Sequence, residues 1–314
     1  RNHFKTPAEF IQWAFFLENS YMEITRVEAL SERIVQSYAW GDAVWHVWGP
    51  QKTRQDGVEH DVDTGDGQSV PSSLVLLHGG SGSWTHWLRN VEHFAQHCDV
   101  WALDIPGFGD SSLPSGVTDA DGLVPYIADI LNQTFQGSAV DVMGFSFGGM
   151  TAGLVAAEYP ALIRQLILVG TPGLGLHGKE LAMRGMTPSM DEAAQREVHR
   201  HNLNAMMFAH PESVTEEVID LQEANVRRDR LRRRRIARTQ ILAQAQARWT
   251  CSVHGVWAEF DALYKDTLQQ VPQVLSNMAS FSIVPNAGHW VMFENPDAFH
   301  AVVDPLLGHG KKTG

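Results

Sequence analysis

VDVMGFSFGG, residues 140–149, runs from an apolar strand-like pattern into a Gly-Phe-Ser-Phe-Gly turn, and small residues of helical character follow at 150–157. This strand–turn–helix order is the context that a nucleophile elbow requires. A serine on so sharp a turn adopts a strained backbone, and the flanking glycines let strand and helix pass without a Cβ clash. The pattern therefore predicts that Ser146 is a nucleophile exposed at the end of a strand.

A serine nucleophile needs a general base and a carboxylate that orients this base. Residues 282–290, SIVPNAGHW, form a short apolar run that ends in a Gly-His turn, and residues 253–261, VHGVWAEFD, form another that ends in acids. We expect His289 to be the base. Both Asp261 and Glu259 are candidates for the acid, and the spacing favours Asp261.

Residues 78–84, HGGSGSW, follow a third apolar strand, so bare backbone can approach a ligand there. We expect the N–H groups of Gly80 and of Phe147, the residue after the serine, to form an oxyanion hole. Gly79 and Ser81 are predicted to contact the substrate.

These motifs, with DIPGFGDS at 104–111, resemble the α/β-hydrolase fold, in the group of serine hydrolases that carries a helical cap. The order Ser146…Asp261…His289 is the order of that fold. Ala258 stands where the family often has glycine. The resemblance implies an α/β protein with a mostly parallel central sheet flanked by helices, a cap inserted after the sixth strand, and catalysis without a cofactor.

The chain-wide pattern predicts a helical arm at residues 1–32, an α/β core at 33–173 and 250–314, and a helical cap at 174–249. Strands alternate with helical stretches in the core, including a helix expected at 84–97. The strand pattern disappears in the cap segment, where the residues favour helix.

Composition excludes several classes of protein. The net charge of −12 argues against a nucleic-acid partner, and no apolar run is long enough to span a membrane. Two cysteines give no disulfide framework, and the histidines at 86–97 lack the glutamate of a metal motif, so no metal is expected. We expect a small-molecule substrate and a cytoplasmic location, and a homo-oligomer is one possible state of assembly. Since the chain begins with Arg1, a cleaved signal peptide is the alternative to a cytoplasmic location.

The cap segment offers two further features. An arginine-rich run at 227–238 is expected to be a solvated helix that pairs with acids of the same chain; the alternative is that one or two arginines face the cleft and bind a substrate carboxylate. Several apolar side chains are candidates for a substrate pocket, with ordinary core packing as the alternative. They are Met183, Met186 and Met207 in the cap segment, and Trp84 and Trp290 beside the motifs.

Together these features predict a serine hydrolase that cleaves a small, largely apolar ester or lactone through an acyl-enzyme on Ser146. A carbon–carbon bond hydrolase of meta-ring-fission products is the alternative, and amides or carbamates fit the same chemistry. A ligand-binding protein without catalysis is a third interpretation, because hydrolase folds host such roles.

Overall fold

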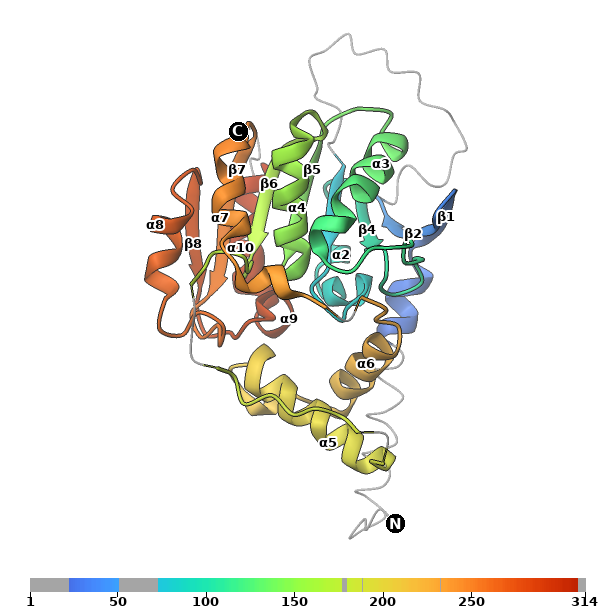
Figure 1. The fold of residues 1–314 in the computed structure, drawn as a ribbon, viewed down its shortest axis with the longest axis vertical. Coiled ribbons are helices and arrows are strands. Elements are labelled where there is room, and N and C mark those ends of the chain that lie inside the picture. The colour runs from blue at the N-terminus through green and yellow to red at the C-terminus, as the bar shows by residue number, and fades with distance from the viewer. Residues whose placement is uncertain (1–22, 51–72, 177–179, 188, 232, 310–314) are drawn as a thin grey trace.

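In the computed structural model, which describes residues 23–50, 73–176, 180–187, 189–231 and 233–309, eight strands form one sheet in the order β1-β2-β4-β3-β5-β6-β7-β8. β2 runs antiparallel to β1 and β4, and the other neighbours pair in parallel (Figure 1). The strands are β1 (Glu32–Tyr38), β2 (Gly41–Trp48), β3 (Leu74–Leu77), β4 (Val100–Asp104), β5 (Val140–Phe145), β6 (Ile163–Val169), β7 (Ser252–Ala258) and β8 (Ser280–Val284).

The central strands are short apolar runs because both faces of the sheet are covered. β3 shows the consequence: Val75 and Leu77 point into one hydrophobic cluster, and Leu74 and Leu76 point into the cluster on the opposite face. All four side chains are fully buried. The sheet is thus fixed between two cores, and its strand ends are fixed with it.

Helices cover both faces of the sheet. The first cluster includes residues of α3, α4 and α7, and the second includes residues of α2, α9 and α10. The α-helices of the core are α2 (Val91–Phe94), α3 (Val124–Thr134), α4 (Phe147–Glu158), α8 (Val271–Val274), α9 (Val291–Glu294) and α10 (Pro296–Leu307).

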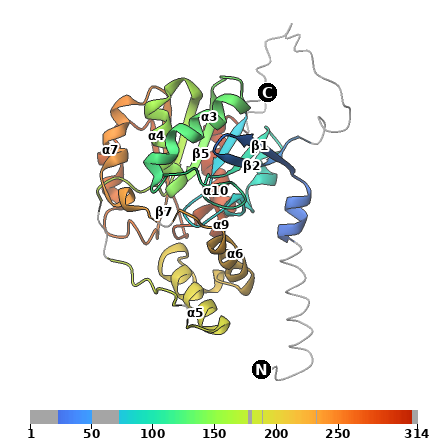
Figure 2. The same ribbon diagram turned by 45° about the vertical axis from the view of Figure 1, so that its right-hand side comes forward.

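The segment between β6 and β7 holds α5 (Glu192–Asn202), α6 (Glu216–Arg227) and α7 (Ile241–Ala245). Figures 1 and 2 show α5 and α6 beyond the carboxyl end of the sheet, whereas α7 lies beside α4 on the core. A helical insertion after the sixth strand is therefore present. The domain bounds at 174 and 249 stay predictions, and the first 22 residues of the arm lie outside the described residues; residues 23–29 are helical.

Two predicted helices are wrong in detail. Instead of one helix at 84–97, the chain makes a 3-10 turn, Trp84–Trp87, and then the short α2. The Ser83 side chain accepts the Thr85 N–H and starts the turn, and the Asn90 amide donates to the carbonyl of Met292 at 2.9 Å, which anchors the chain between the two pieces.

The arginine-rich run is also not one helix. α6 ends at Arg227, and the described residues from 228 to 234 have no helical hydrogen-bond pattern before a 3-10 turn at Arg235–Arg238. The Arg230 N–H donates to the carbonyl of Gly107, and the Leu231 side chain is buried in the core. The Arg230 N–H and the Leu231 side chain thus contact the core, and an N–H that binds Gly107 is not available for a hydrogen bond within a helix.

Candidate active site

Ser146 lies at the junction of β5 and α4 with φ 50° and ψ −116°, a strained conformation for a residue with a side chain. Its N–H donates to the carbonyl of Val169 on the neighbouring strand at 2.7 Å, which fixes the turn to the sheet. A Cβ on Gly149 would lie 2.6 Å from the carbonyl oxygen of Gly144, so the glycines are needed for this crossing. The backbone at Ser146 thus has the sharp strand-to-helix turn that the sequence predicts.

His289 reaches Ser146 from the loop after β8. Its Nε2 lies 3.0 Å from the Ser146 hydroxyl, and its Nδ1 lies 2.8 Å from an oxygen of Asp261. Since the carboxylate accepts the Nδ1 proton, Nε2 is free to accept the proton of the hydroxyl. The Asp261 and His289 side chains are almost fully buried. The three predicted residues are therefore joined in one hydrogen-bonded line.

Asp261 follows β7 and is held on both carboxylate oxygens. One faces His289, and the other accepts the N–H of Leu263 at 3.0 Å. Glu259, the other candidate, is exposed and accepts the N–H of Asn286 instead. The structure therefore brings Asp261, and not Glu259, to the histidine.

The loop after β6 supports this acid–base pair. Gly170 has φ 53°, and a Cβ there would lie 3.2 Å from both the Asp261 carboxylate and the His289 ring. The Tyr264 hydroxyl donates to the carbonyl of Thr171, and burial raises the pKa of this hydroxyl well above its ordinary value. Close packing on this side fixes the carboxylate opposite the imidazole.

The predicted oxyanion hole has donors on both sides. The N–H of Phe147 is the first of α4, and the first N–H groups of a helix have no partner within the helix. On the other side the Gly79 N–H donates to Nδ1 of His86 at 3.1 Å, so this amide is occupied. The next amide, that of Gly80, stays the predicted donor to a substrate oxygen in this loop.

Two buried histidines hold the loop of residues 78–84, which we call the oxyanion loop after its predicted role. Burial lowers the pKa of His78 to about 3 and that of His86 well below its ordinary value, so both rings are neutral. His78 accepts the N–H of Ile105 at Nε2 (3.0 Å) and donates from Nδ1 to the Gly79 carbonyl (2.7 Å). The peptide groups around Gly79 are thus oriented by two imidazoles; sequence reasoning left His86 without this role, although it lies two residues beyond the motif.

Asp104 at the end of β4 organises the adjacent glycine-rich loop. Its carboxylate accepts the N–H groups of Trp84 and Asp110, each at 2.9 Å. Burial raises its pKa to about 6. The carboxylate therefore joins two loops at the site's edge.

The arginine-rich segment crosses the same edge. Arg228 pairs with Asp110 at 3.2 Å, and Arg230 donates to the carbonyls of Phe108 and Gly109. The expected pairing of these arginines with acids of the same chain is present, although the expected helix is not.

Arg234 goes further than its neighbours and reaches the oxyanion loop. Its Nη2 pairs with Asp229 and lies 3.2 Å from the Ser81 hydroxyl, which donates to Asp229 at 2.6 Å. Ser81 has φ 51°, so a strained residue of the loop is held by two side chains of the inserted segment.

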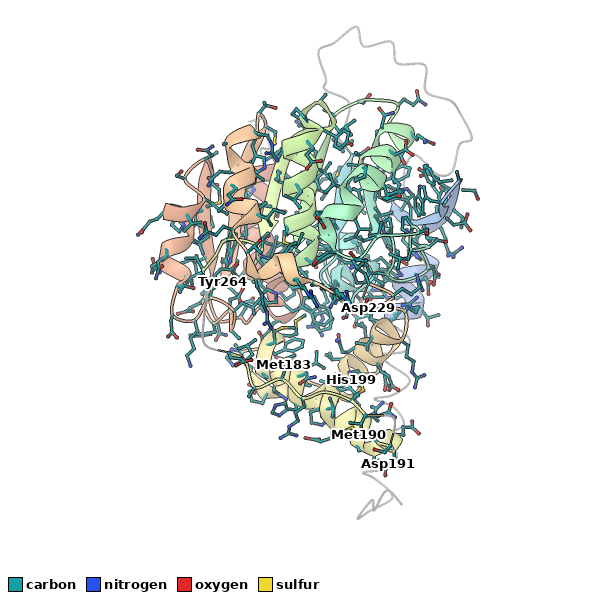
Figure 3. The ribbon with its side chains drawn as sticks, in the orientation of Figure 1. Met183, Met190, Asp191, His199, Asp229 and Tyr264 are labelled. Atoms are coloured by element: carbon teal, nitrogen blue, oxygen red, sulfur yellow. The ribbon has the colours of Figure 1, made fainter. Side chains whose placement is uncertain are left out.

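A cleft of about 630 Å³ lies at the border of core and cap. Its lining combines apolar side chains, among them Leu174, Leu181, Met183, Met206 and Leu263, with Tyr264 and with the charged residues Glu180 and Arg238. Figure 3 shows Met183 facing the core side of the cap, whereas Met190 and Asp191 lie at the far end. Met186 and Met207 are not among the residues that line this cleft; Met186 is exposed, and Met207 is buried in the second hydrophobic cluster.

Trp84 and Trp290 are packed as core. Trp84 stacks on His46 with ring centroids 5.0 Å apart, and Trp290 contacts His86 at 4.7 Å and Phe293 at 4.3 Å. Both indoles are almost fully buried. The two indole rings therefore pack in the core beneath the loops that carry the motifs. A direct contact of either ring with the substrate stays a prediction.

A second link between cap and core was not predicted. The Glu294 carboxylate accepts the N–H of Gly288, beside the histidine, and the N–H groups of Ala209 and His210 in the cap segment. A Cβ on Gly288 would lie 2.6 Å from the Ala209 nitrogen, so only glycine fits between them. The glycine before the histidine is visible in the sequence, but the sequence does not indicate that residue 209 of the cap segment packs against it.

Among the described residues, no group of three or more histidine, cysteine, aspartate or glutamate side chains is arranged to hold a metal ion. His93 is occupied by Asp304 at 2.9 Å. In the same part of the chain, no helix combines the length and the apolar character that a membrane crossing needs.

Comparison with known proteins gives the same architecture. A model of a family described as "Alpha/beta hydrolase family" matches residues 74–302. The carboxylesterase CesB of Bacillus subtilis superposes with a TM-score of 0.63 at 18% identity, over 92% of this chain and 98% of that one.

Two curated proteins are similar over most of their length. The 2-hydroxy-6-oxo-2,4-heptadienoate hydrolase of Pseudomonas putida is 25% identical over 269 residues, 79% of this chain and 91% of that protein. The 2-hydroxy-6-oxo-6-phenylhexa-2,4-dienoate hydrolase of Burkholderia cepacia is 27% identical over 274 residues, 80% of this chain and 91% of that protein.

Proposed function

The chain belongs to the alpha/beta hydrolase family and is a hydrolase; on that premise we propose that it is a serine hydrolase that cleaves a small, largely apolar ester or lactone through an acyl-enzyme on Ser146. The observation that carries the proposal is the line Ser146–His289–Asp261, with contacts of 3.0 and 2.8 Å. Such a line supplies a nucleophile, its base and the orienting acid.

In the proposed first step, the Ser146 oxygen attacks the carbonyl carbon while Nε2 of His289 takes the hydroxyl proton. The carbonyl electron pair moves to the oxygen, where the Gly80 and Phe147 amides would stabilise it. His289 then gives its proton to the leaving alcohol as the tetrahedral intermediate collapses. Water attacks the acyl-enzyme by the same route, and Ser146 is regenerated.

The cleft between core and cap supports an apolar substrate. It borders Tyr264 and Pro172, next to the loop that packs on Asp261. We place the apolar part of the substrate there, because leucine and methionine side chains form part of the lining. A cytoplasmic location and assembly into a homo-oligomer stay predictions of the sequence.

A carbon–carbon bond hydrolase is the second candidate. Two relatives that cover most of this chain are hydrolases of 2-hydroxy-6-oxo-dienoates. Ser146 would attack the ketone carbonyl while His289 takes the hydroxyl proton, and His289 would then give this proton to the carbon leaving group in place of an alcohol.

The test is steady-state hydrolysis of p-nitrophenyl esters of increasing acyl length, beside a 2-hydroxy-6-oxo-dienoate, by the wild type and Ser146→Ala. We expect turnover of short or medium esters that the variant loses by at least about 10⁴-fold. Turnover of the dienoate alone would establish the second candidate. A folded wild type that turns over neither substrate, and does not react with a fluorophosphonate at Ser146, would refute both.

A further inference from the structure

Arg234 has a buried donor that nothing in the described chain uses. Its guanidinium binds Asp229 and Ser81 through Nη2, at one end of the fork. Its Nε is buried and has no hydrogen-bond partner among the described residues. A buried N–H without an acceptor is costly, and such exceptions call for an explanation.

The guanidinium lies against both residues of the proposed oxyanion hole. A Cβ on Gly80 would be 3.0 Å from Nε and 3.2 Å from Cζ. On the other side, Cζ lies 5.7 Å from the ring centroid of Phe147, the residue after the nucleophile. The unused donor therefore lies beside Gly80, and the guanidinium that carries it lies beside the Phe147 ring.

The position of Arg234 is fixed by its surroundings. Asp229, whose side chain is only 10% exposed, holds Nη2, and Cζ lies 5.3 Å above the Phe108 ring. A guanidinium held by an ion pair and by two aromatic faces is oriented before any substrate binds. Preorganised donors are the ones that stabilise a developing charge at low cost.

We propose that Arg234 is a third donor of the oxyanion hole, supplied by the inserted segment, and that its Nε–H binds the substrate oxygen that becomes negative when Ser146 attacks. The inference rests on the proposed acyl-enzyme mechanism. The electron pair of the carbonyl moves to that oxygen, the serine proton moves to His289, and Arg234 stays protonated throughout.

This role differs from the binding of a substrate carboxylate by the same side chain. A donor to the developing oxyanion acts mainly in the transition state, so its loss lowers kcat and leaves KM nearly unchanged. A carboxylate site would act on KM, and only for acidic substrates. If Arg234 only held Ser81 in place, a variant that keeps the conformation of the loop would keep full activity without the arginine.

The experiment compares Arg234→Gln and Arg234→Lys with Arg233→Gln, a matched loss of charge at the exposed neighbouring arginine. Three quantities are measured: kcat and KM for p-nitrophenyl butyrate, and the inhibition constant of phenylboronic acid, which forms a tetrahedral anionic adduct on a serine. Thermal unfolding confirms that each variant is folded.

We expect Arg234→Gln to lower kcat by about 100-fold and to weaken the boronic acid by a similar factor, with KM within about threefold. Arg234→Lys should recover part of both effects, and Arg233→Gln should change neither. The proposal is wrong if Arg234→Gln keeps kcat and boronic acid affinity within about threefold, or if only KM rises.

Ser81→Ala separates a direct role from a positioning role, because it removes the hydroxyl that lies between Asp229 and the loop. If this variant reproduces the whole loss of Arg234→Gln, the arginine acts through the loop and the proposal is overturned. A wild type that binds no boronic acid and forms no fluorophosphonate adduct would instead show that the proposed function itself has failed.

Discussion

The carboxyl edge of the sheet and the inserted segment that faces it hold their functional residues in different ways. At the sheet edge, Ser146 follows β5 and Asp261 follows β7, both of which pair with β6, and buried side chains pack on both faces of these strands. In the inserted segment, Asp229 and Arg234 are placed by ion pairs and irregular backbone. The sheet fixes positions through many small contacts, whereas the segment depends on a few strong ones.

The largest expected effect is at the sheet edge. Asp261→Asn should lower kcat by about 10⁴-fold, because the amide no longer holds the tautomer of His289 that accepts the serine proton. Glu259→Gln is the matched control and should retain activity within about threefold, since this exposed carboxylate accepts a backbone N–H, that of Asn286, away from the histidine. Ester hydrolysis under saturating substrate measures both; equal losses would contradict the assignment of the acid.

Backbone packing gives the next contrast. In Gly148→Ala, the new methyl group would clash with the carbonyl oxygens of Leu77 and His78, and we expect a loss of about 3 kcal/mol in the free energy of unfolding. Gly185 in the cap segment has open space around it, so Gly185→Ala should change stability by less than about 0.5 kcal/mol. Urea unfolding of both variants tests this, and similar losses at the two sites would remove the distinction between core and cap.

The response to pH should come mainly from the core, although burial also lowers the pKa of His199 in α5 of the cap. Burial lowers the pKa of His46 to about 4, of His78 to about 3 and of His300 to about 4, from an ordinary value of 6.5. Because the unfolded chain then binds more protons than the folded one, the stability that these neutral rings contribute is present above pH 6.5 and is lost as the pH falls toward 4.

Asp104 acts in the opposite direction, since its pKa is raised from 3.8 to about 6 and its protonation on acidification favours the folded state. The three histidines outweigh it, so we expect a net loss of a few kcal/mol between pH 7.5 and 4.5. In the cap, the Arg196 and Arg200 guanidinium groups hold the pKa of Glu216 below 4.5, so this residue adds nothing in that range. Urea midpoints across the range measure the net effect, and a flat profile would disprove it.

The smallest effect is expected inside the cap. Arg196 joins α5 to Glu216 and Asp220 of α6. Arg196→Met should cost about 1 kcal/mol or less, because partly exposed ion pairs contribute little, and kcat should stay unchanged. Chemical unfolding and ester hydrolysis check the two parts; a loss of kcat beyond tenfold would show that the packing of α5 on α6 reaches the catalytic residues.

The same contrast explains what could be predicted from the sequence. Strand runs and the turns that follow them are local patterns, so the elbow, the histidine turn and the acid turn could be placed from the order of the residues alone. The parallel sheet brings such turns to one edge, and this is why Ser146, Asp261 and His289 are within hydrogen-bond distance of one another.

The inserted segment could not be predicted in this way. A run rich in arginine favours helix by propensity, yet Arg230 and Leu231 are used by the core surface, and tertiary contacts override propensity. The helix expected at 84–97 is divided for a similar reason, since Asn90 binds the carbonyl of Met292, about two hundred residues away. Contacts over such separations leave no local signal.

The double attachment of the inserted segment, through Glu294 beside the histidine loop and through Asp229 and Arg234 at the oxyanion loop, has a consequence for modularity. A chimaera that exchanges residues 174–249 as one block with those of another hydrolase would replace Arg234, our proposed third oxyanion donor, as well as the side chains that line the cleft. An exchange confined to residues 189–206 would leave both attachments in place. Grafts with the narrower boundary should therefore retain catalytic power while changing selectivity.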